Sequence, residues 1–254
     1  MSILEGTADV LRLMSRLKRG VTMSDVVEHL GLPKSTASRM LKQLGEFGFL
    51  ERDPRTLVYH PGLLLLEVAH QVRRNSSLAD HLVEALEALR DETGHTGYLS
   101  VLDAREVLVL RVLPGMHALR VMTNPGSRSP AAATSTGRAL LARLPDDEVL
   151  RLYADGVLRG AAASPQTPAE LLARLAEVRQ RGWAVAVDEA VSGAASVSCA
   201  VGDPQTGEAQ AFCLTFPSGM AAPVEVERIA ALLTKHAVRI GRTVGDGYWL
   251  NYQG

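Results

Sequence analysis

The fold of this chain is decided near its start by the stretch TMSDVVEHLGLPKSTASRMLKQLGEFGFL, which runs from Thr22 to Leu50. Thr22 followed three residues later by Asp25 forms a capping-box pattern, in which each side chain binds the other's backbone amide at a helix start. Gly31 ends this first helix, because glycine adopts a positive φ without steric cost. Pro33 suits the first turn of a second helix, where its missing N–H costs nothing. The stretch therefore predicts two short helices joined by a tight turn.

The second of these helices is amphipathic. Its apolar residues recur at three- and four-residue spacing and predict a buried face. Its other side holds short hydroxyls and long cations, which can contact phosphates and base edges when a helix lies in the major groove of DNA. The candidate DNA-contacting residues on this helix are Lys34, Ser35, Thr36, Ser38, Arg39 and Lys42. An ordinary surface helix with solvated charges is the alternative interpretation of this pattern.

The segments on either side extend the prediction to a winged helix-turn-helix. Residues 5–18 carry apolar residues at helical spacing and predict a helix that packs behind the helix pair. After Leu50, the sequence ERDPRTLVYHPG predicts a hairpin with strands at 49–51 and 56–59. We expect Arg52 and Arg55 in this wing to meet DNA phosphates. A surface β-turn without a partner is the alternative.

Composition and charge fit a DNA-binding head on a larger body. The chain has 254 residues, of which 46% are hydrophobic, enough for one large domain or two modest ones. Residues 1–75 contain eleven Lys/Arg and eight Asp/Glu, a balance of +3, and the remainder carries −4. A mildly basic head with an acidic body indicates a head that meets nucleic acid and a body with another task.

The cysteines and the apolar runs bear on cofactors and compartment. Cys199 and Cys213 show no metal-ligand spacing, and the histidines are scattered, so we expect no metal and no cofactor. The first residues lack the basic start of a signal peptide. No apolar run approaches the ~20 residues that a membrane span needs. These observations predict a cytoplasmic protein in a reducing compartment.

The rest of the chain predicts a linker helix and an α+β domain. A helix over residues 62–74 contains four consecutive leucines, which we expect to pack against a twin helix or the following domain. Further helices are predicted at 78–92, from 134, at 146–153, 168–181 and 224–244, and strands at 97–102, 107–113, 119–122, 183–187, 196–201 and 209–216. An antiparallel sheet covered by helices is compatible with a small-molecule sensor. The predicted domains are a winged helix-turn-helix over 1–61, a linker helix over 62–77 and an effector-binding domain over 78–254.

The order of these motifs resembles the IclR family of bacterial transcription regulators. The resemblance covers nearly the whole chain and rests on LPKSTASRMLKQLGEFGFLER, on GSRSPAAATSTGRALLARLPDDE, on Gly182-Trp183-Ala184, on Asp188-Glu189 and on DPQTGEAQAF. It implies a winged helix joined by a linker helix to a GAF-like effector domain. It also implies dimers or tetramers that respond to small metabolites, often organic acids.

The resemblance implies a set of effector-binding residues. Carried over by motif, they are Thr134, Gly137, Asp188, Ser196, Cys213 and Thr215. The chain departs from the family pattern at this surface, with Ala132 in place of a histidine and Ser196 in place of a cysteine. Cys213 and Thr215 replace a pair of serines. The effector of another family member therefore does not transfer to this chain.

Physical reasoning on the same residues favours a small anion. A helix N-terminus at Thr134 offers free N–H groups and the positive end of a dipole, which suits a carboxylate. Ser196 and Thr215 can add hydroxyl donors from strand positions on one face. Asp188 would repel an anion unless it accepts a hydrogen bond from a ligand hydroxyl or amide. The alternative is that Thr134 only caps its helix, and that Ser196 and Thr215 are satisfied core hydroxyls.

The function predicted from these features is a ligand-responsive transcription regulator, either repressor or activator. Its expected partners are a double-stranded DNA operator, a small effector that is an organic or aromatic acid, and further copies of the chain as a dimer or dimer of dimers. A DNA-binding protein without a ligand is one alternative. An enzyme fused to a winged helix is another, but the chain contains no GxSxG, HExxH, Walker or dinucleotide-binding motif.

Overall fold

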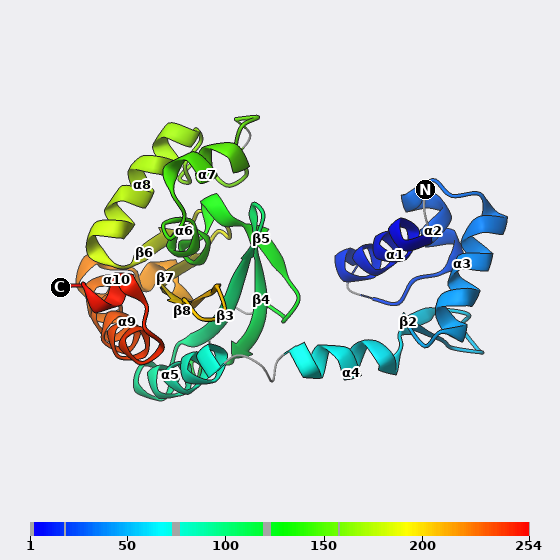
Figure 1. The fold of residues 1–254 in the computed structure, drawn as a ribbon, viewed down its shortest axis with the longest axis horizontal. Coiled ribbons are helices and arrows are strands. Elements are labelled where there is room, and N and C mark those ends of the chain that lie inside the picture. The colour runs from blue at the N-terminus through cyan, green and yellow to red at the C-terminus, as the bar shows by residue number, and fades with distance from the viewer. Residues whose placement is uncertain (1–2, 18, 73–76, 119–122, 157, 254) are drawn as a thin grey trace. The chain divides into compact units, whose positions relative to one another are not determined.

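The computed structural model describes residues 3–17, 19–72, 77–118, 123–156 and 158–253. The chain forms two compact units, Met1–Ser76 and Ser77–Gly254 (Figure 1). The first unit consists of α1 (Ile3–Leu17), α2 (Met23–Leu30), α3 (Lys34–Glu46), β1 (Leu50–Arg52), β2 (Tyr59–Pro61) and α4 (Leu63–Val72). Three helices followed by a two-stranded antiparallel hairpin confirm the predicted winged helix-turn-helix.

The helix pair of the first unit is fixed by the local signals that the sequence carries. The Asp25 N–H donates to Thr22 Oγ1 at 3.1 Å and the Thr22 N–H donates to Asp25 Oδ2 at 2.8 Å, which completes the capping box. Arg19 forks onto the same carboxylate at 2.7 and 2.9 Å and holds the pKa of Asp25 well below its usual range. Gly31 has φ +64° and ends α2 as predicted. Pro33 lies one position earlier than predicted, as the residue before the first turn of α3.

The wing differs from the prediction in its second strand, which begins at Tyr59 rather than at residue 56. The Asp53 carboxylate accepts the backbone N–H groups of Arg55 at 2.8 Å and Thr56 at 3.3 Å. These bonds lower the pKa of Asp53 and extend the turn. Leu57 then has φ +59°, so that pairing resumes only at Tyr59 opposite Arg52.

The second unit is a helix-covered antiparallel sheet. Its elements are α5 (Ser77–Thr93), β3 (Thr96–Asp103), β4 (Glu106–Leu113), β5 (Arg128–Pro130), the 3-10 turn η1 (Ala131–Ala133), α6 (Ser135–Leu141), α7 (Asp146–Leu152), α8 (Pro168–Arg181), β6 (Ala184–Val187), β7 (Ala194–Asp203), β8 (Glu208–Pro217), the 3-10 turn η2 (Ser218–Met220), α9 (Pro223–Val244) and α10 (Gly247–Leu250). The strand order is β5-β4-β3-β8-β7-β6. The architecture confirms the predicted α+β class.

Each face of this sheet carries its own core. Helices α5 and α9 cover one face, where the leucines at 82, 86 and 89 pack against Phe212 and Leu214 (Figure 1). Helices α6, α7 and α8 cover the other face, where seven of the fifteen described residues in the buried cluster are alanines. On that face the strand residues under α6 change along the sheet, from Ala200 and Ala211 to hydroxyl and thiol side chains. This second face is therefore the one that combines close helix packing with polar groups.

Two parts of the sheet and its surroundings were missed from the sequence. The predicted third strand at 119–122 lies outside the described residues, whereas β4 pairs with the unpredicted short strand β5. The unpredicted α10 follows α9 and buries Trp249 completely. The Trp249 side chain packs directly on Gly241, where an added Cβ would lie only 2.4 Å from it.

Candidate DNA-binding and effector sites

The candidate DNA-contacting residues of α3 share its outer face. Ala37, Leu41 and Leu44 anchor the helix in the core of the first unit. The opposite residues are exposed or half-buried, namely Lys34, Ser35, Thr36, Ser38, Arg39 and Lys42. Lys42 forms an exposed ion pair with Glu46 at 3.6 Å, a weak interaction that DNA can displace. Arg39 forms no ion pair with any residue that the structure describes. The helix thus presents hydroxyls and cations on a rigid support.

The two arginines of the wing have different surroundings. Arg55 lies exposed in the turn of the hairpin. The Arg52 guanidinium lies 5.7 Å from the centre of the Tyr59 ring, a cation–π distance. Tyr59 itself packs partly against the core of the first unit and pairs with Val21 through backbone hydrogen bonds. The ring therefore orients Arg52, while Arg55 is the freer cation.

A row of hydroxyl and thiol groups lies on the sheet face beneath the start of α6. Ser196 of β7 pairs with Thr215 of β8, and Ser198 pairs with Cys213 in the same register. The Ser135 hydroxyl shares hydrogen bonds of 2.7 Å with Ser196 and 2.7 Å with Ser198. We call Ser196, Ser198, Cys213 and Thr215 the hydroxyl row. Three of the predicted effector residues are brought together in it.

Members of the hydroxyl row differ in how accessible they are. Ser198 and Cys213 are buried, and Ser198 also shares a hydrogen bond of 3.1 Å with Thr136. Ser196 and Thr215 are half-buried and retain exposed surface. The alternative interpretation concerns Ser196 and Thr215 themselves: the Ser196 hydroxyl already has Ser135 as a partner, but both residues keep exposed surface.

Thr134 and Gly137 serve the helix that they begin. Thr134 Oγ1 accepts the Gly137 N–H at 3.0 Å, so this threonine is an N-cap and one orphan amide is already satisfied. A Cβ at position 137 would lie 2.2 Å from the Ala131 carbonyl oxygen, which only glycine avoids. Both residues therefore position α6 above the hydroxyl row.

Asp188 is not joined to the hydroxyl row by any hydrogen bond among the described residues. It is exposed, has φ +56° and accepts the Gly193 N–H at 2.6 Å, which ties the loop between β6 and β7. The side chain of its neighbour Glu189 is buried instead and pairs with Arg138 of α6. The acidic residue that approaches α6 is thus the second of the pair, not the first.

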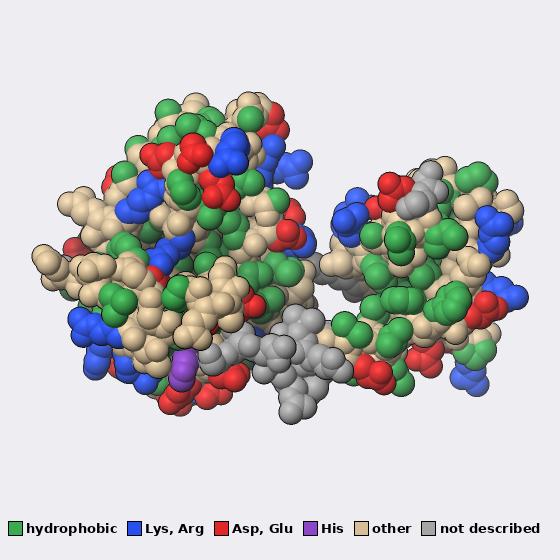
Figure 2. All heavy atoms as spheres, viewed as in Figure 1, with side chains coloured by type: hydrophobic (Ala, Val, Ile, Leu, Met, Phe, Trp, Pro, Cys, Tyr) green, Lys and Arg blue, Asp and Glu red, His purple; other side chains and the backbone are tan. Residues whose placement is uncertain are grey.

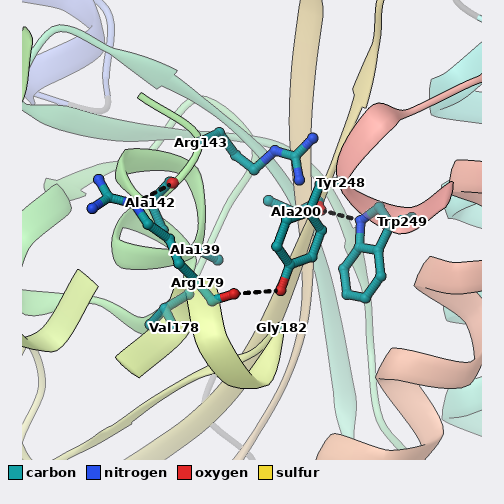
Figure 3. Close-up of a pocket in the computed structure, with 9 residues that line it drawn as sticks. All are labelled: Ala139, Ala142, Arg143, Val178, Arg179, Gly182, Ala200, Tyr248 and Trp249. Atoms are coloured by element: carbon teal, nitrogen blue, oxygen red, sulfur yellow. Dashed lines mark hydrogen bonds between the residues drawn. The ribbon is translucent and has the colours of Figure 1, made fainter. Parts of the chain in front are cut away.

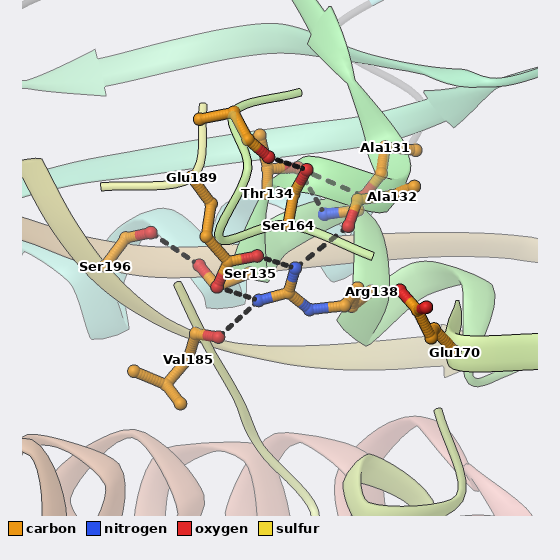
Figure 4. A network of polar contacts seen from close by, with 12 residues as sticks. Ala131, Ala132, Thr134, Ser135, Arg138, Ser164, Glu170, Val185, Glu189 and Ser196 are labelled. Carbon is orange, nitrogen blue, oxygen red and sulfur yellow. Dashed lines mark hydrogen bonds and ion pairs between the residues drawn. The ribbon is translucent and has the colours of Figure 1, made fainter. Parts of the chain in front are cut away.

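A buried ion pair between Arg138 and Glu189 is the feature that sequence reasoning missed (Figure 4). Arg138 is 2% and Glu189 6% exposed, and their two hydrogen bonds measure 2.6 and 2.9 Å. Arg138 also donates to the Ala132 carbonyl at 2.9 Å and to the Val185 carbonyl. The Glu189 carbonyl in turn accepts the Ala161 N–H at 2.9 Å. The two residues of the ion pair together therefore join η1, β6 and the loops that follow β6 and α7.

The polar groups near the hydroxyl row carry no net charge. Burial raises the pKa of Tyr98 to about 12, and its hydroxyl accepts the Thr123 N–H at 3.1 Å. Burial also raises the pKa of the Cys213 thiol, which keeps it protonated. The charge of Arg138 is neutralised by Glu189. The row therefore offers hydrogen bonds rather than a net charge, and no group of three or more His, Cys, Asp or Glu side chains in the described residues could hold a metal ion.

Comparison with known proteins decides the family. The family model described as "Bacterial transcriptional regulator IclR C-terminal" matches residues 70–242, and that of the "IclR helix-turn-helix domain" matches residues 4–54. The chain belongs to the IclR family. As an IclR-family protein it is an HTH-type transcriptional regulator, and its relatives are regulators rather than enzymes.

Two curated relatives illustrate the similarity across this family. The HTH-type transcriptional regulator XynR of Escherichia coli K12 is 26% identical over 247 residues, which cover 95% of this chain and 96% of XynR. The probable transcriptional regulator SauR of Cupriavidus necator is 31% identical over 193 residues, which cover 76% of this chain and 77% of SauR. Both alignments extend over most of each protein.

Solved IclR-type structures share the fold. The regulator from Alicyclobacillus acidocaldarius has a TM-score of 0.82 at 25% identity, covering 94% of this chain and 97% of that one. An IclR homolog from Microbacterium hydrocarbonoxydans, solved in complex with 4-hydroxybenzoate, has a TM-score of 0.81 at 24% identity over 96% and 99% of the two chains. No helix in the described part of our chain is long and apolar enough to cross a membrane.

Proposed function

We propose that this IclR-family regulator binds operator DNA through α3 and the wing, and that a small organic or aromatic acid held at the hydroxyl row modulates this binding. The domain assignment that goes with it is a DNA-binding head over 1–61, a linker helix over 62–77 and an effector domain over 78–254. The observation that carries the proposal is the accessible hydroxyl pair, Ser196 and Thr215, beneath a helix start.

The DNA-binding half is supported by the outer face of α3. Hydroxyls at the start of the helix suit phosphates or base edges, and Arg39 can fork onto a guanine. Arg52 and Arg55 extend the same cationic surface from the wing. Lys34, Ser35, Thr36, Ser38, Arg39 and Lys42 complete the proposed contact set.

Selection from a random pool of double-stranded DNA with the full chain gives the operator, and Arg39→Ala then tests the contact. We expect operator affinity to fall by about 1–3 kcal/mol if Arg39 reads a base. Arg151→Ala is the matched control, because this arginine is an exposed residue of α7 in the second unit. Equal affinities of the Arg39 variant and the unaltered chain remove Arg39 from the contact set.

The effector half is supported by chemistry and by a relative. Hydroxyl donors suit the carboxylate or phenol oxygens of an acid. The Microbacterium hydrocarbonoxydans protein, similar in fold, was solved with 4-hydroxybenzoate. Because Arg138 is neutralised by Glu189, recognition of an acid here rests on hydrogen bonds and not on a free cation.

A thermal-shift screen of small aliphatic and aromatic acids on the full chain tests this half, since a ligand that binds only the folded state raises its stability. Thr215→Val, which removes one accessible hydroxyl and keeps the side-chain shape, is expected to weaken the response to the selected acid while operator binding persists. Calorimetry that gives the same acid affinity for both proteins contradicts the assignment of Thr215. A screen without any stabilising acid favours the alternative, a DNA-binding regulator that does not use a ligand.

Self-association is the remaining part of the proposal. On α4, Leu63 is 70% and Leu66 67% exposed, and Val68 is also exposed. Ile3 and Leu4 at the start of α1 add to the apolar surface of the first unit, where hydrophobic side chains gather on the face seen in Figure 2. Leu63 and Leu66 lie three positions apart on one side of α4, and an exposed apolar surface of this kind indicates a protein interface. We assign it to a second copy of the chain, because two copies would present two recognition helices to a pseudo-palindromic operator.

A further inference from the structure

A cavity of about 340 Å³ opens in the second unit at the end of α6, away from the hydroxyl row (Figure 3). Its walls come from α6, α8, β7 and α10 and are mostly apolar, with Ala142, Val178 and Ala200 among them. Tyr248 and Trp249 add aromatic surface. A volume of this size falls within the range of small-ligand sites, which are mostly apolar with a few polar groups.

Arg143 supplies the polar group of this cavity. Its side chain is only 20% exposed, and its guanidinium lies 4.9 Å from the centre of the Tyr248 ring. One nitrogen, Nη2, donates to Asp246. The Nε and Nη1 groups of Arg143 have no acceptor among the residues that the structure describes. Neither group is among the fully buried unpaired atoms of the described residues, so water reaches them, and a ligand acceptor can take the place of that water.

The second arginine that lines the cavity, Arg179, differs from Arg143 because its donors already have protein acceptors. Arg179 donates from Nε to the Ala142 carbonyl at 2.9 Å and from Nη2 to the Leu144 carbonyl at 2.9 Å. Its Nη1 donates to Asp146 at 2.6 Å. Arg179 therefore closes the wall between α6 and α8, and Arg143 is the group available to a ligand.

The charge around Arg143 indicates what kind of acceptor fits. The Asp246 side chain is 1% exposed and also accepts the backbone N–H groups of Gly202 at 2.7 Å and Tyr248 at 3.0 Å. This fixed carboxylate already neutralises Arg143. A second carboxylate on the same guanidinium would add uncompensated negative charge, whereas a neutral carbonyl oxygen would not.

We propose that this cavity binds a single-ring aromatic compound with a neutral hydrogen-bond acceptor, such as an aryl amide. The ring lies against Ala142, Val178 and Ala200, and the acceptor oxygen takes the free N–H groups of Arg143. Nothing in this assignment depends on the hydroxyl row, which lies at the opposite end of α6.

Trp249 makes the proposal directly testable. The chain contains two tryptophans, and Trp183→Phe leaves Trp249 as the single indole. Its Nε1–H donates to the Ala200 carbonyl at 2.8 Å, so the indole is tied to the cavity wall. We expect titration of this variant of the full chain with benzamide to produce a saturable change in Trp249 emission. Benzoate should bind more weakly, and toluene, which lacks the acceptor, about tenfold more weakly.

Two variants on the Trp183→Phe background assign the signal to the cavity. Arg143→Met removes the donors and should weaken benzamide binding about tenfold. Ala142→Met fills the space and should abolish the saturable change, which decides the question if the first variant does not fold. The absence of any saturable change, or one that Ala142→Met leaves intact, overturns the site. Tighter binding of benzoate than of benzamide, in a signal that Ala142→Met abolishes, overturns the assigned ligand class.

Discussion

The two residues of the buried ion pair Arg138–Glu189 differ in how many other hydrogen bonds they make, so removing one or the other should cost different amounts of stability. The Glu189 carboxylate accepts hydrogen bonds from Arg138 alone among the described residues, whereas Arg138 also donates to the Ala132 and Val185 carbonyls. Arg138→Met therefore leaves a buried carboxylate and both carbonyls without a donor. Glu189→Met leaves a guanidinium that still has its two carbonyl acceptors.

We expect Arg138→Met to cost about 3–5 kcal/mol of unfolding free energy in the second unit, the range for breaking a buried ion pair from one side. For a unit of this size the melting temperature should fall by roughly 6–20 °C. Glu189→Met should cost less. The double variant should be more stable than Arg138→Met, because it removes the uncompensated charge and leaves only the two unpaired carbonyls that both variants share, at about 1–3 kcal/mol each.

Urea unfolding of the full chain, followed by tryptophan emission, measures these differences. Trp183 and Trp249 both lie in the second unit, so the first unit does not contribute to the signal. A free energy of unfolding within about 1 kcal/mol of the unaltered chain for Arg138→Met would show that water or a rearranged loop satisfies Glu189. A double variant less stable than Arg138→Met would refute the charge argument itself.

Two further predictions concern pH and self-association. Burial lowers the pKa of His95, and the charge of His117 lowers it further. As the pH falls, the histidine at position 95 is therefore protonated in the unfolded chain before it is protonated in the folded one. The second unit should for this reason lose stability as the pH falls from about 7 to 5. In His95→Phe, the urea midpoint should fall less between about pH 7 and pH 5 than it does in the unaltered chain. Burial also lowers the pKa of His236, which should account for part of the remaining fall. An unchanged pH dependence in His95→Phe would contradict the assignment. Leu66→Glu on α4 should lower the molecular mass measured by light scattering. Leu150→Glu is the control, because Leu150 is an exposed residue of α7, and it should leave the mass unchanged. Equal masses for the unaltered chain and both variants would exclude α4 as the interface.

Local signals explain why the helices could be predicted so closely from the sequence. The capping box at Thr22 and the left-handed Gly31 set the ends of α2 from neighbouring residues. Thr167 and Gly182 do the same for α8, which runs over the predicted residues. In each case the atoms that stop the helix are within a few positions of it, so the pattern is visible in sequence.

Features that depend on distant partners were missed or shifted. Glu189 is buried because Arg138, 51 positions away, is there to neutralise it, and no local pattern distinguishes it from exposed Asp188. The second wing strand begins late because the Asp53 side chain prolongs its turn. Helix α10 is too short to have its own periodicity and forms because Trp249 fills the space above Gly241.

The candidate effector residues came from family resemblance, and the structure divides them by role. Ser196, Cys213 and Thr215 share one face, Thr134 and Gly137 build the helix above it, and Asp188 belongs to a loop. Sequence spacing alone could not make this division, because it depends on which strands are neighbours. Whether a ligand contacts Ser196 and Thr215 stays a prediction.

The close approach of Gly137 to Ala131 limits how this protein can change over evolutionary time. Any side chain at position 137 would strike the Ala131 carbonyl, so the start of α6 is nearly immutable. Ser196 and Thr215 stand on strands whose backbone pairing does not depend on their side chains, and both keep exposed surface. New ligand preferences can therefore arise by single substitutions on the strands while the helix stays constant. A mutational library restricted to these strand positions would explore this freedom without loss of the fold.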